Sequence, residues 1–262
     1  CIRDRYDNGT HFQLLWTHLI PATMEGKATH NVQNAMFAAA LAFGMNKSLE
    51  DIRHGLRTFN STIFQAPGRM NVFDEHPFRV ILDYGHNAAA IQSIGQLVDR
   101  LEVRGRRICV LAAPGDRRDE DIRAIAQAAV GHFDHYICKA DDNRRGRGDD
   151  EVPQMLRTQL IQDGERQENI EVISSEPMAV SAALERAGEG DLVVIFGDNI
   201  ERCWKQVAGY EVTDSAGGTA EPETLVQSFV EEDPEAFMLD PDSELIRDER
   251  GVRIARIDEE SD

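Results

Sequence analysis

Short apolar runs alternate with helical stretches from Phe78 to Val207, and this alternation constrains the fold more than any other feature. The apolar runs span residues 78–83, 107–113, 135–140, 170–174 and 191–197. The helical stretches cover residues 88–101, 119–131, 151–162, 177–187 and 199–207. Strands that alternate with helices form βαβ units around a mainly parallel sheet. The sequence therefore predicts an α/β fold, with a Rossmann-like domain over this region.

The residues before this region predict a smaller, separate set of elements. Residues 10–20 are strand-like, and residues 30–44 have an alanine-rich helical texture that ends at Gly44 as a C-cap. A second helix follows Ser48, which is placed to cap it with Asp51 three residues on. Residues 60–69 then interrupt the pattern with polar residues, a proline and a glycine, and are a candidate interdomain linker.

Polar segments follow four of the predicted strands, and the topology should bring them together. They read "DYGHN", "PGDRRDED", "KADDNRRGRG" and "GDN". In an open parallel sheet, ligands bind beyond the carboxyl ends of the strands. We therefore expect these four segments to meet at one edge.

The first of these segments suggests a nucleotide contact. Asp83 ends a strand, where its carboxylate can accept hydrogen bonds from the vicinal hydroxyls of a ribose. His86 and Asn87 lie at the following turn and helix start, where free N–H groups favour anionic or electron-rich ligands. The alternative is an ordinary strand-to-helix turn in which Asn87 caps the helix.

The charge of the chain argues against nucleic-acid partners. Residues 209–262 contain seventeen acidic residues and four arginines, so they carry −13 of the net charge of −19. The one basic cluster, "RRGRG" at 144–148, has two acidic residues on either side, so the sequence predicts no nucleic-acid binding. We expect the acidic tail to be flexible, with one possible hairpin in "SELIRDERGVRIARID".

Targeting and metal-binding patterns are weak. The four cysteines form no C-x-x-C pair, and no apolar run approaches the length of a membrane span, so we expect free thiols, no membrane partner and a cytoplasmic location. His132 and His135 lack a third ligand nearby, so no metal site is expected. The chain starts without a methionine and in mid-pattern, which suggests a fragment of a longer protein.

Several motifs together resemble a known family. "HNVQNAMFAAALA", "IRHGLRTF", "PGRMNVF" and "ILDYGHN", in this order, are similar to the junction of the central and C-terminal domains in the Mur ligase superfamily of ATP-dependent amide ligases. "APGDRRDEDI" and "KADDNRRGRG" are most similar to the Mur-ligase-like part of cyanophycin synthetases. The resemblance implies the end of a central ATP-binding domain in residues 1–67, a C-terminal Rossmann-like domain in 68–208 and an acidic tail in 209–262.

The resemblance also implies roles for single residues. Asn31 and Asn34, from the H-N-x-x-N motif, would approach the adenine of ATP, and Arg69 would reach the phosphates. Asp83 would contact the ribose, with His86 and Asn87 beside the nucleotide. Each has a structural alternative, such as a helix cap for Asn31 or a surface position for Arg69.

The implied reaction activates a carboxylate with ATP to an acyl phosphate, which an amine then attacks. In cyanophycin synthetases this part would add L-arginine to the aspartate side chain of an aspartate-arginine polymer, in a full-length protein that is a homo-oligomer. A guanidinium favours paired carboxylates. The candidate substrate-binding residues follow strand ends; they are Asp116, Arg117, Arg118, Asp119, Asp141 and Asp142, with Asp198 as a further acid. For any single one, a solvated surface charge is the alternative.

Two departures from the family pattern limit the expected activity. Gly85 and Ala88 replace the usual alanine and proline of the "DYAHNP" motif. No G-x-x-G-K-[ST] phosphate loop occurs, so the loop and the Mg²⁺ ligands are expected upstream, and this chain alone should not catalyse ligation. Two other interpretations stay open: a different Mur-type ligase of the peptidoglycan-precursor or folylpolyglutamate type, or an inactive assembly or polymer-binding domain.

Overall fold

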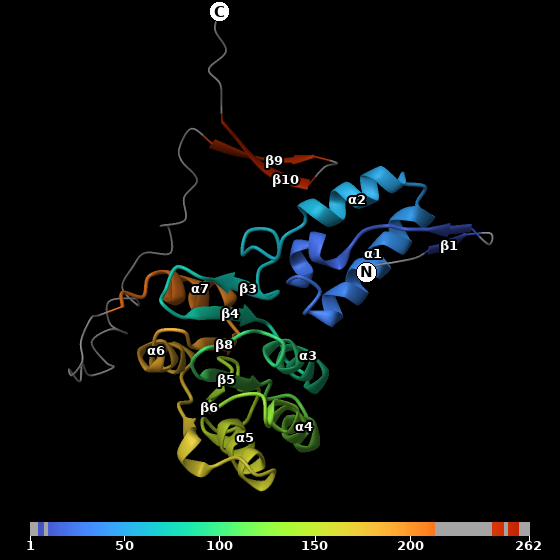
Figure 1. Ribbon diagram of the computed structural model, residues 1–262. Coiled ribbons are helices and arrows are strands. Elements are labelled where there is room, and N and C mark those ends of the chain that lie inside the picture. Colours follow the sequence, from blue (N-terminus) through green and yellow to red (C-terminus); the bar gives the residue numbers. More distant parts are fainter. Residues whose placement is uncertain (1–4, 8–9, 213–242, 249–250, 257–262) are drawn as a thin grey trace, which may run out of the picture. The chain divides into compact units, whose positions relative to one another are not determined.

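The chain forms two compact units. The computed structural model describes residues 5–7, 10–212, 243–248 and 251–256 (Figure 1). Residues Cys1–Gly218 belong to one unit and Thr219–Asp262 to the other. The predicted boundaries at residues 67 and 208 remain predictions.

A six-stranded sheet forms the centre of the first unit. Its strand order is β3-β4-β8-β5-β6-β7. The bounds are β3 Asn71–Phe73, β4 Arg79–Asp83, β5 Arg107–Ala113, β6 His135–Ala140, β7 Ile170–Val172 and β8 Leu192–Phe196. Strands β4 to β8 pair in parallel, and only the edge strand β3 is antiparallel. The predicted α/β class and mainly parallel sheet are confirmed.

Five helices cover the two faces of this sheet, with α3, α4 and α5 on one face and α6 and α7 on the other (Figure 1). Their bounds are α3 Ala88–Val98, α4 Asp119–Ala129, α5 Glu151–Gln162, α6 Glu176–Arg186 and α7 Ile200–Ala208. A short 3₁₀ turn, η3 (Gln167–Asn169), precedes β7. Each face has its own apolar core, so the strands are buried on both sides.

Strand β4 shows why the strands read as unbroken apolar runs. Ile81 packs into the core under α3, α4 and α5, whereas Val80 and Leu82 pack into the core under α6 and α7. Successive side chains of a strand point to opposite faces, so a strand covered on both faces needs apolar residues at every position. Among the buried residues of β4 only Asp83, at the carboxyl end, departs from this pattern, whereas Arg79 at the other end is exposed.

The edge strand β3 has no counterpart among the predicted strands. It has three residues, and its first, Asn71, is fully buried. The Asn71 side chain accepts a hydrogen bond from Gly68 N and donates to the carbonyls of Ser61 and Ala66. A short strand that begins on an asparagine has too little apolar periodicity to be recognised from sequence.

The residues before β3 correct one expectation. Only Thr10–Phe12 (β2) of the expected strand at 10–20 forms a strand, and it pairs with β1 (Arg5–Asp7). Two 3₁₀ turns follow, η1 (Thr17–Leu19) and η2 (Pro21–Thr23). Pro21 lacks an N–H for a sheet ladder, and the Thr23 hydroxyl donates to the Thr17 and Ile20 carbonyls, which closes the turns.

The two helices of this segment form as expected, except at one end. Helix α1 spans Thr29–Gly44, and α2 spans Leu49–Thr58 with Ser48 as its cap, bonded to Asp51 N. Gly44 is the last helical residue and not the left-handed one, which is Asn46 at φ 60°. Lys47 N–H donates to Ala42 and Asn46 N–H to Phe43, so Asn46 takes the place of glycine in a Schellman motif.

The second unit contains the hairpin that the tail pattern indicated. Strands β9 (Ser243–Asp248) and β10 (Gly251–Arg256) pair antiparallel, with Arg253 opposite Ile246. Residues 213–242, on which the expectation of a flexible tail falls, lie outside the described residues.

Candidate functional site

A small polar pocket lies at the carboxyl end of the sheet, where the four loops predicted to meet do meet. Its volume is about 150 Å³. Residues after β4, β5, β6 and β8 all line it, including His86, Asp116, Arg117, Asp141, Arg145 and Asp198. Strand β8 lies between β4 and β5, so consecutive strands of the sequence are separated there, as in the crevices where α/β sheets bind ligands.

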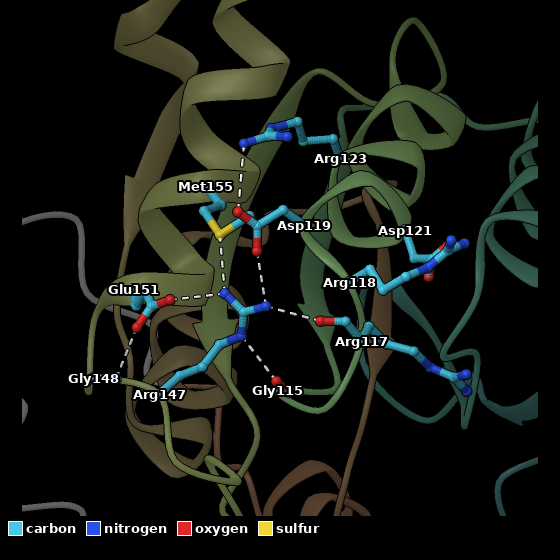
Figure 2. A network of polar contacts seen from close by, with 10 residues as sticks. All are labelled: Gly115, Arg117, Arg118, Asp119, Asp121, Arg123, Arg147, Gly148, Glu151 and Met155. Carbon is cyan, nitrogen blue, oxygen red and sulfur yellow. Dashed lines mark hydrogen bonds and ion pairs between the residues drawn. The ribbon is translucent and has the colours of Figure 1, made fainter.

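Arg147 holds two of these loops together (Figure 2). Its guanidinium donates to the carbonyl oxygens of Gly115 and Arg117, each at 2.8 Å. It also donates to Asp119 Oδ1 at 2.8 Å and to Glu151 Oε1 at 2.7 Å. The planar five-donor group suits such a forked set of acceptors. The loop after β5 and the loop after β6 are therefore tied by one side chain.

A close backbone approach reinforces this tie. A Cβ on Gly115 would lie 2.3 Å from the carbonyl oxygen of Arg144, so no larger residue fits without a shift of one loop. Arg145, next in the chain, forms an ion pair with Asp116 across the same two loops. The walls of the pocket are thus defined before any ligand binds.

A buried charge cluster supports the other side of the pocket. The Lys139 ammonium in β6 is fully buried and lies 2.6 Å from Glu176 Oε2 and 3.8 Å from Asp141 Oδ1. Glu176 also accepts from Arg202 at 2.6 Å. Burial alone would raise the pKa of Glu176, but the Lys139 charge and the hydrogen bonds to the carboxylate lower it to about 2.

Asp141 is the acid that faces the pocket from this cluster. Burial raises the pKa of Asp141 above its ordinary value; Lys139 and Arg145 oppose that rise, whereas Asp198 and Glu176 add to it. Two carboxylates, Asp141 and Asp198, therefore line the same small pocket, and their mutual repulsion favours a cation between them.

The other candidate substrate residues occupy several places. Asp116 and Arg117 line the pocket with Asp141. Asp119 pairs with Arg147, and Asp142 pairs with Arg202 at 2.8 Å. Arg118 precedes α4 and pairs with Asp121 at 2.9 Å. These last three take part in ion pairs around the pocket and are not among its lining residues.

The candidate nucleotide residues divide between two places. Asn31, Asn34 and Arg69 line a larger pocket of about 850 Å³ between α1, α2 and the segment before β3. Asn31 donates to the Ala22 carbonyl and accepts from Asn34 at 3.1 Å. An amide pair and a guanidinium on one pocket suit a base edge and a phosphate.

Asp83, His86 and Asn87 lie outside that larger pocket. Asp83 is 8% exposed, and its Oδ2 accepts a hydrogen bond from Met70 N–H at 2.9 Å. Burial raises the pKa of Asp83. His86 lines the small polar pocket and bonds through Nδ1 to the Tyr84 carbonyl. Asn87 caps α3 by accepting from Ala90 N–H, which is the alternative role that the sequence left open.

Sequence reasoning missed the residues that organise the small pocket. The sequence shows Arg145 and Arg147 only as part of a basic cluster, and it predicts no role for Glu176, Lys139 or Arg202. The available signal was Lys139, a lysine inside "HYICKA", because a charged residue in a strand buried on both faces needs a buried partner. That partner, Glu176, lies far along the chain.

Other features of the described residues are structural. Cys109, Cys138 and Cys203 are buried free thiols. Across the ranges with described placement, no three His, Cys, Asp or Glu side chains are grouped so that they could hold a metal ion. No helix in the described part of the chain is long and apolar enough to cross a membrane.

The fold, the polar edge of the sheet and the sequence motifs define a class of protein. The family model described as "Mur ligase, glutamate ligase domain" matches residues 68–199, and the chain belongs to this family. More particularly, it is 39% identical over 202 residues to the cyanophycin synthetase of Nostoc sp. and 36% identical over 183 residues to that of Crocosphaera subtropica. These matches cover 73% and 70% of this chain but only 22% and 21% of the relatives, so the chain spans about a fifth of their length.

Solved structures show the same fold. "E.coli FolC in complex with DHPP and ADP" aligns with a TM-score of 0.52 at 24% identity and covers 67% of this chain and 39% of that one. The folylpolyglutamate synthase of Thermotoga maritima aligns with a TM-score of 0.51 at 19% identity, over 78% of this chain and 43% of that one.

Proposed function

We propose that this chain is part of a cytoplasmic ATP-dependent amide ligase that adds L-arginine to the aspartate side-chain carboxylate of an aspartate-arginine polymer. The observation that carries the proposal is the pair of carboxylates, Asp141 and Asp198, in the small pocket of a chain that is 39% identical to a cyanophycin synthetase. A guanidinium binds well to two such acceptors, because it can donate hydrogen bonds to both at once.

The pocket also offers a group for the other end of an amino acid. Arg117 also lines it and can pair with an α-carboxylate. Arg145 is already engaged with Asp116, so that pair adds little net charge. An arginine held at both its guanidinium and its carboxylate would have its α-amine oriented for attack.

The chemistry proceeds in two balanced steps. A carboxylate oxygen of the polymer attacks the terminal phosphorus of ATP, which forms an acyl phosphate and releases ADP. The neutral α-amine of arginine then attacks the carbonyl carbon, and the tetrahedral intermediate expels phosphate while the nitrogen loses a proton. Within this chain, Asn31, Asn34 and Arg69 would hold the nucleotide in the larger pocket. Asp83 and His86, at the carboxyl end of β4, would contact the same nucleotide. Mg²⁺ would be held by ligands elsewhere in the full-length protein.

The experiment is ATP-dependent incorporation of labelled amino acids into an aspartate-backbone primer by the full-length protein. We expect arginine to be incorporated and lysine to be a poor substitute, because a point-charge ammonium cannot satisfy a forked site. Incorporation of glutamate or a diamino acid, without arginine, would leave a different Mur-type ligase as the function. No incorporation of any amino acid would favour an assembly or polymer-binding role.

A matched pair of variants tests the pocket itself. Asp141→Asn with Asp198→Asn should raise the KM for arginine at least tenfold and leave the KM for ATP nearly unchanged. The control is Asp149→Asn, because Asp149 lies in the same loop with its side chain 77% exposed. Equal KM values for arginine in the variant and the control would contradict the assignment.

A further inference from the structure

Lys139 and Glu176 form an ion pair that is entirely out of reach of solvent. Both side chains are 0% exposed, and Nζ and Oε2 are 2.6 Å apart. Lys139 is the last residue but one of β6, opposite Ala112 of β5, and Glu176 is the first residue of α6. The pair therefore lies directly below the loops that line the small pocket.

The Glu176 carboxylate organises the end of β8 by accepting hydrogen bonds from the backbone there. Its Oε2 accepts from Asp198 N–H at 2.7 Å, and its Oε1 accepts from Asn199 N–H at 3.1 Å and from Arg202 at 2.6 Å. Asp198 in turn accepts from Asp142 N–H through Oδ2 at 3.1 Å. Glu176 thus sets where Asp198 begins its turn, and Asp198 connects the β8 loop to the β6 loop.

Stability alone gives little reason for this pair. Two buried charges lose hydration, and a well-packed apolar pair of similar size is often equally or more stable. Lys139 Nζ also lacks a hydrogen bond of good geometry among the described residues, although it is fully buried. What the pair does provide is a fixed positive charge 3.8 Å from Asp141 and a fixed anchor for Asp198.

We infer that Lys139 and Glu176 are positioning residues of the small pocket, which hold Asp141 and Asp198 as a matched pair of acceptors for the cationic group of the amino-acid substrate. This inference rests on the proposed function for the use of the pocket, and it holds for any amino acid with a cationic side chain, not for arginine alone. The groups that face Asp141 are Lys139 from β6, Glu176 from α6, Asp198 after β8 and Arg145 from its own loop.

The test uses the full-length protein with Lys139→Met and with the double variant Lys139→Met and Glu176→Gln. The double variant removes both charges, so neither member of the pair is left as an uncompensated buried charge if the single variant is unstable. We expect the KM for the incorporated amino acid to rise about tenfold in both, with the KM for ATP within twofold of wild type. The control is Arg186→Met, which breaks an ion pair of the same 2.6 Å length with Glu171 at the other end of α6.

A second readout separates positioning from general support of the fold. Lys139 lowers the pKa of Asp141, so its removal raises that pKa, and the acidic limb of kcat/KM for the amino acid should move to higher pH. If Lys139 only supported the fold, the acidic limb of kcat/KM would stay at the wild-type pH. A folded double variant with wild-type KM for the amino acid would overturn the inference, as would a folded Lys139→Met variant with wild-type KM and pH profile, because Glu176 raises the pKa that Lys139 lowers. Should wild type incorporate another cationic amino acid in place of arginine, the same variants are assayed with that amino acid, so the two proposals fail separately.

Discussion

The carboxylate of Asp83 accepts a hydrogen bond from the backbone N–H of Met70, across 2.9 Å, at the carboxyl end of β4. Met70 has a left-handed backbone at φ 50°, and its sulfur lies 3.0 Å from His30 Nε2. Asp83 therefore fixes the turn that carries Arg69, in addition to the ribose contact that we propose for it. A variant at this position must separate the two roles.

We expect Asp83→Ala to reduce kcat/KM for ATP in the full-length protein by tens- to over a hundredfold, because a lost charged contact costs about 2–3 kcal/mol. Asp83→Asn retains an oxygen for Met70 N–H, so it should unfold at nearly the wild-type temperature and still show a defect with ATP. Steady-state kinetics and thermal unfolding measure the two effects. Wild-type ATP kinetics in both variants would contradict the ribose assignment.

Gly115→Ala should disturb the small pocket. The new Cβ would lie 2.3 Å from the Arg144 carbonyl oxygen, and relief requires a shift of the loop after β5 or β6. Overpacking of this kind costs about 1–3 kcal/mol. We expect a lower unfolding midpoint and a higher KM for arginine. Gly148→Ala is the control, because its Cβ would meet nothing closer than 3.9 Å.

Arg147→Lys should loosen the same two loops although the charge is kept. A lysine ammonium cannot reach the Gly115 and Arg117 carbonyls and both carboxylates together, since it lacks the planar fork. We expect a loss of about 1–2 kcal/mol in the free energy of unfolding by urea, together with a higher KM for arginine. The corresponding change at Arg166, whose side chain is 78% exposed, should alter neither quantity. Equal effects at the two sites would show that the Arg147 hydrogen bonds contribute nothing to stability or to arginine binding.

Glu176 should make stability depend on pH at the acidic end. Its pKa is about 2 in the folded chain, below the ordinary value of 4.5. Ionised Glu176 therefore stabilises the fold fully above pH 4.5, and this contribution is lost as the pH falls from there towards 2. The difference in unfolding free energy between wild type and Glu176→Gln should be constant from pH 7 to 5.5 and smaller at pH 3. A difference that does not change with pH would contradict the depressed pKa.

The sequence by itself determined the local elements of the sheet domain. The runs at 107–113 and 135–140 match β5 and β6 residue for residue, and the expected helix at 151–162 matches α5. Ser48 caps α2 as the pattern indicated. These features depend on neighbours within a few residues, where side-chain periodicity and capping act, so the sequence contains the information directly. The meeting of four loops at one edge also followed, because all parallel strands end on the same side.

Only the tertiary structure decided which residues of those loops became partners. The insertion of β8 between β4 and β5 brings Asp198 to the pocket that Asp141 also lines, and no local pattern specifies that strand order. Two further contacts join residues that are distant in sequence. They are the ion pair of Lys139 with Glu176 and the hydrogen bond from Arg147 to the Gly115 carbonyl. The physical reason is that a buried charge or carbonyl must find a partner among the groups that folding brings within about 3 Å, and burial of both sheet faces selects those groups.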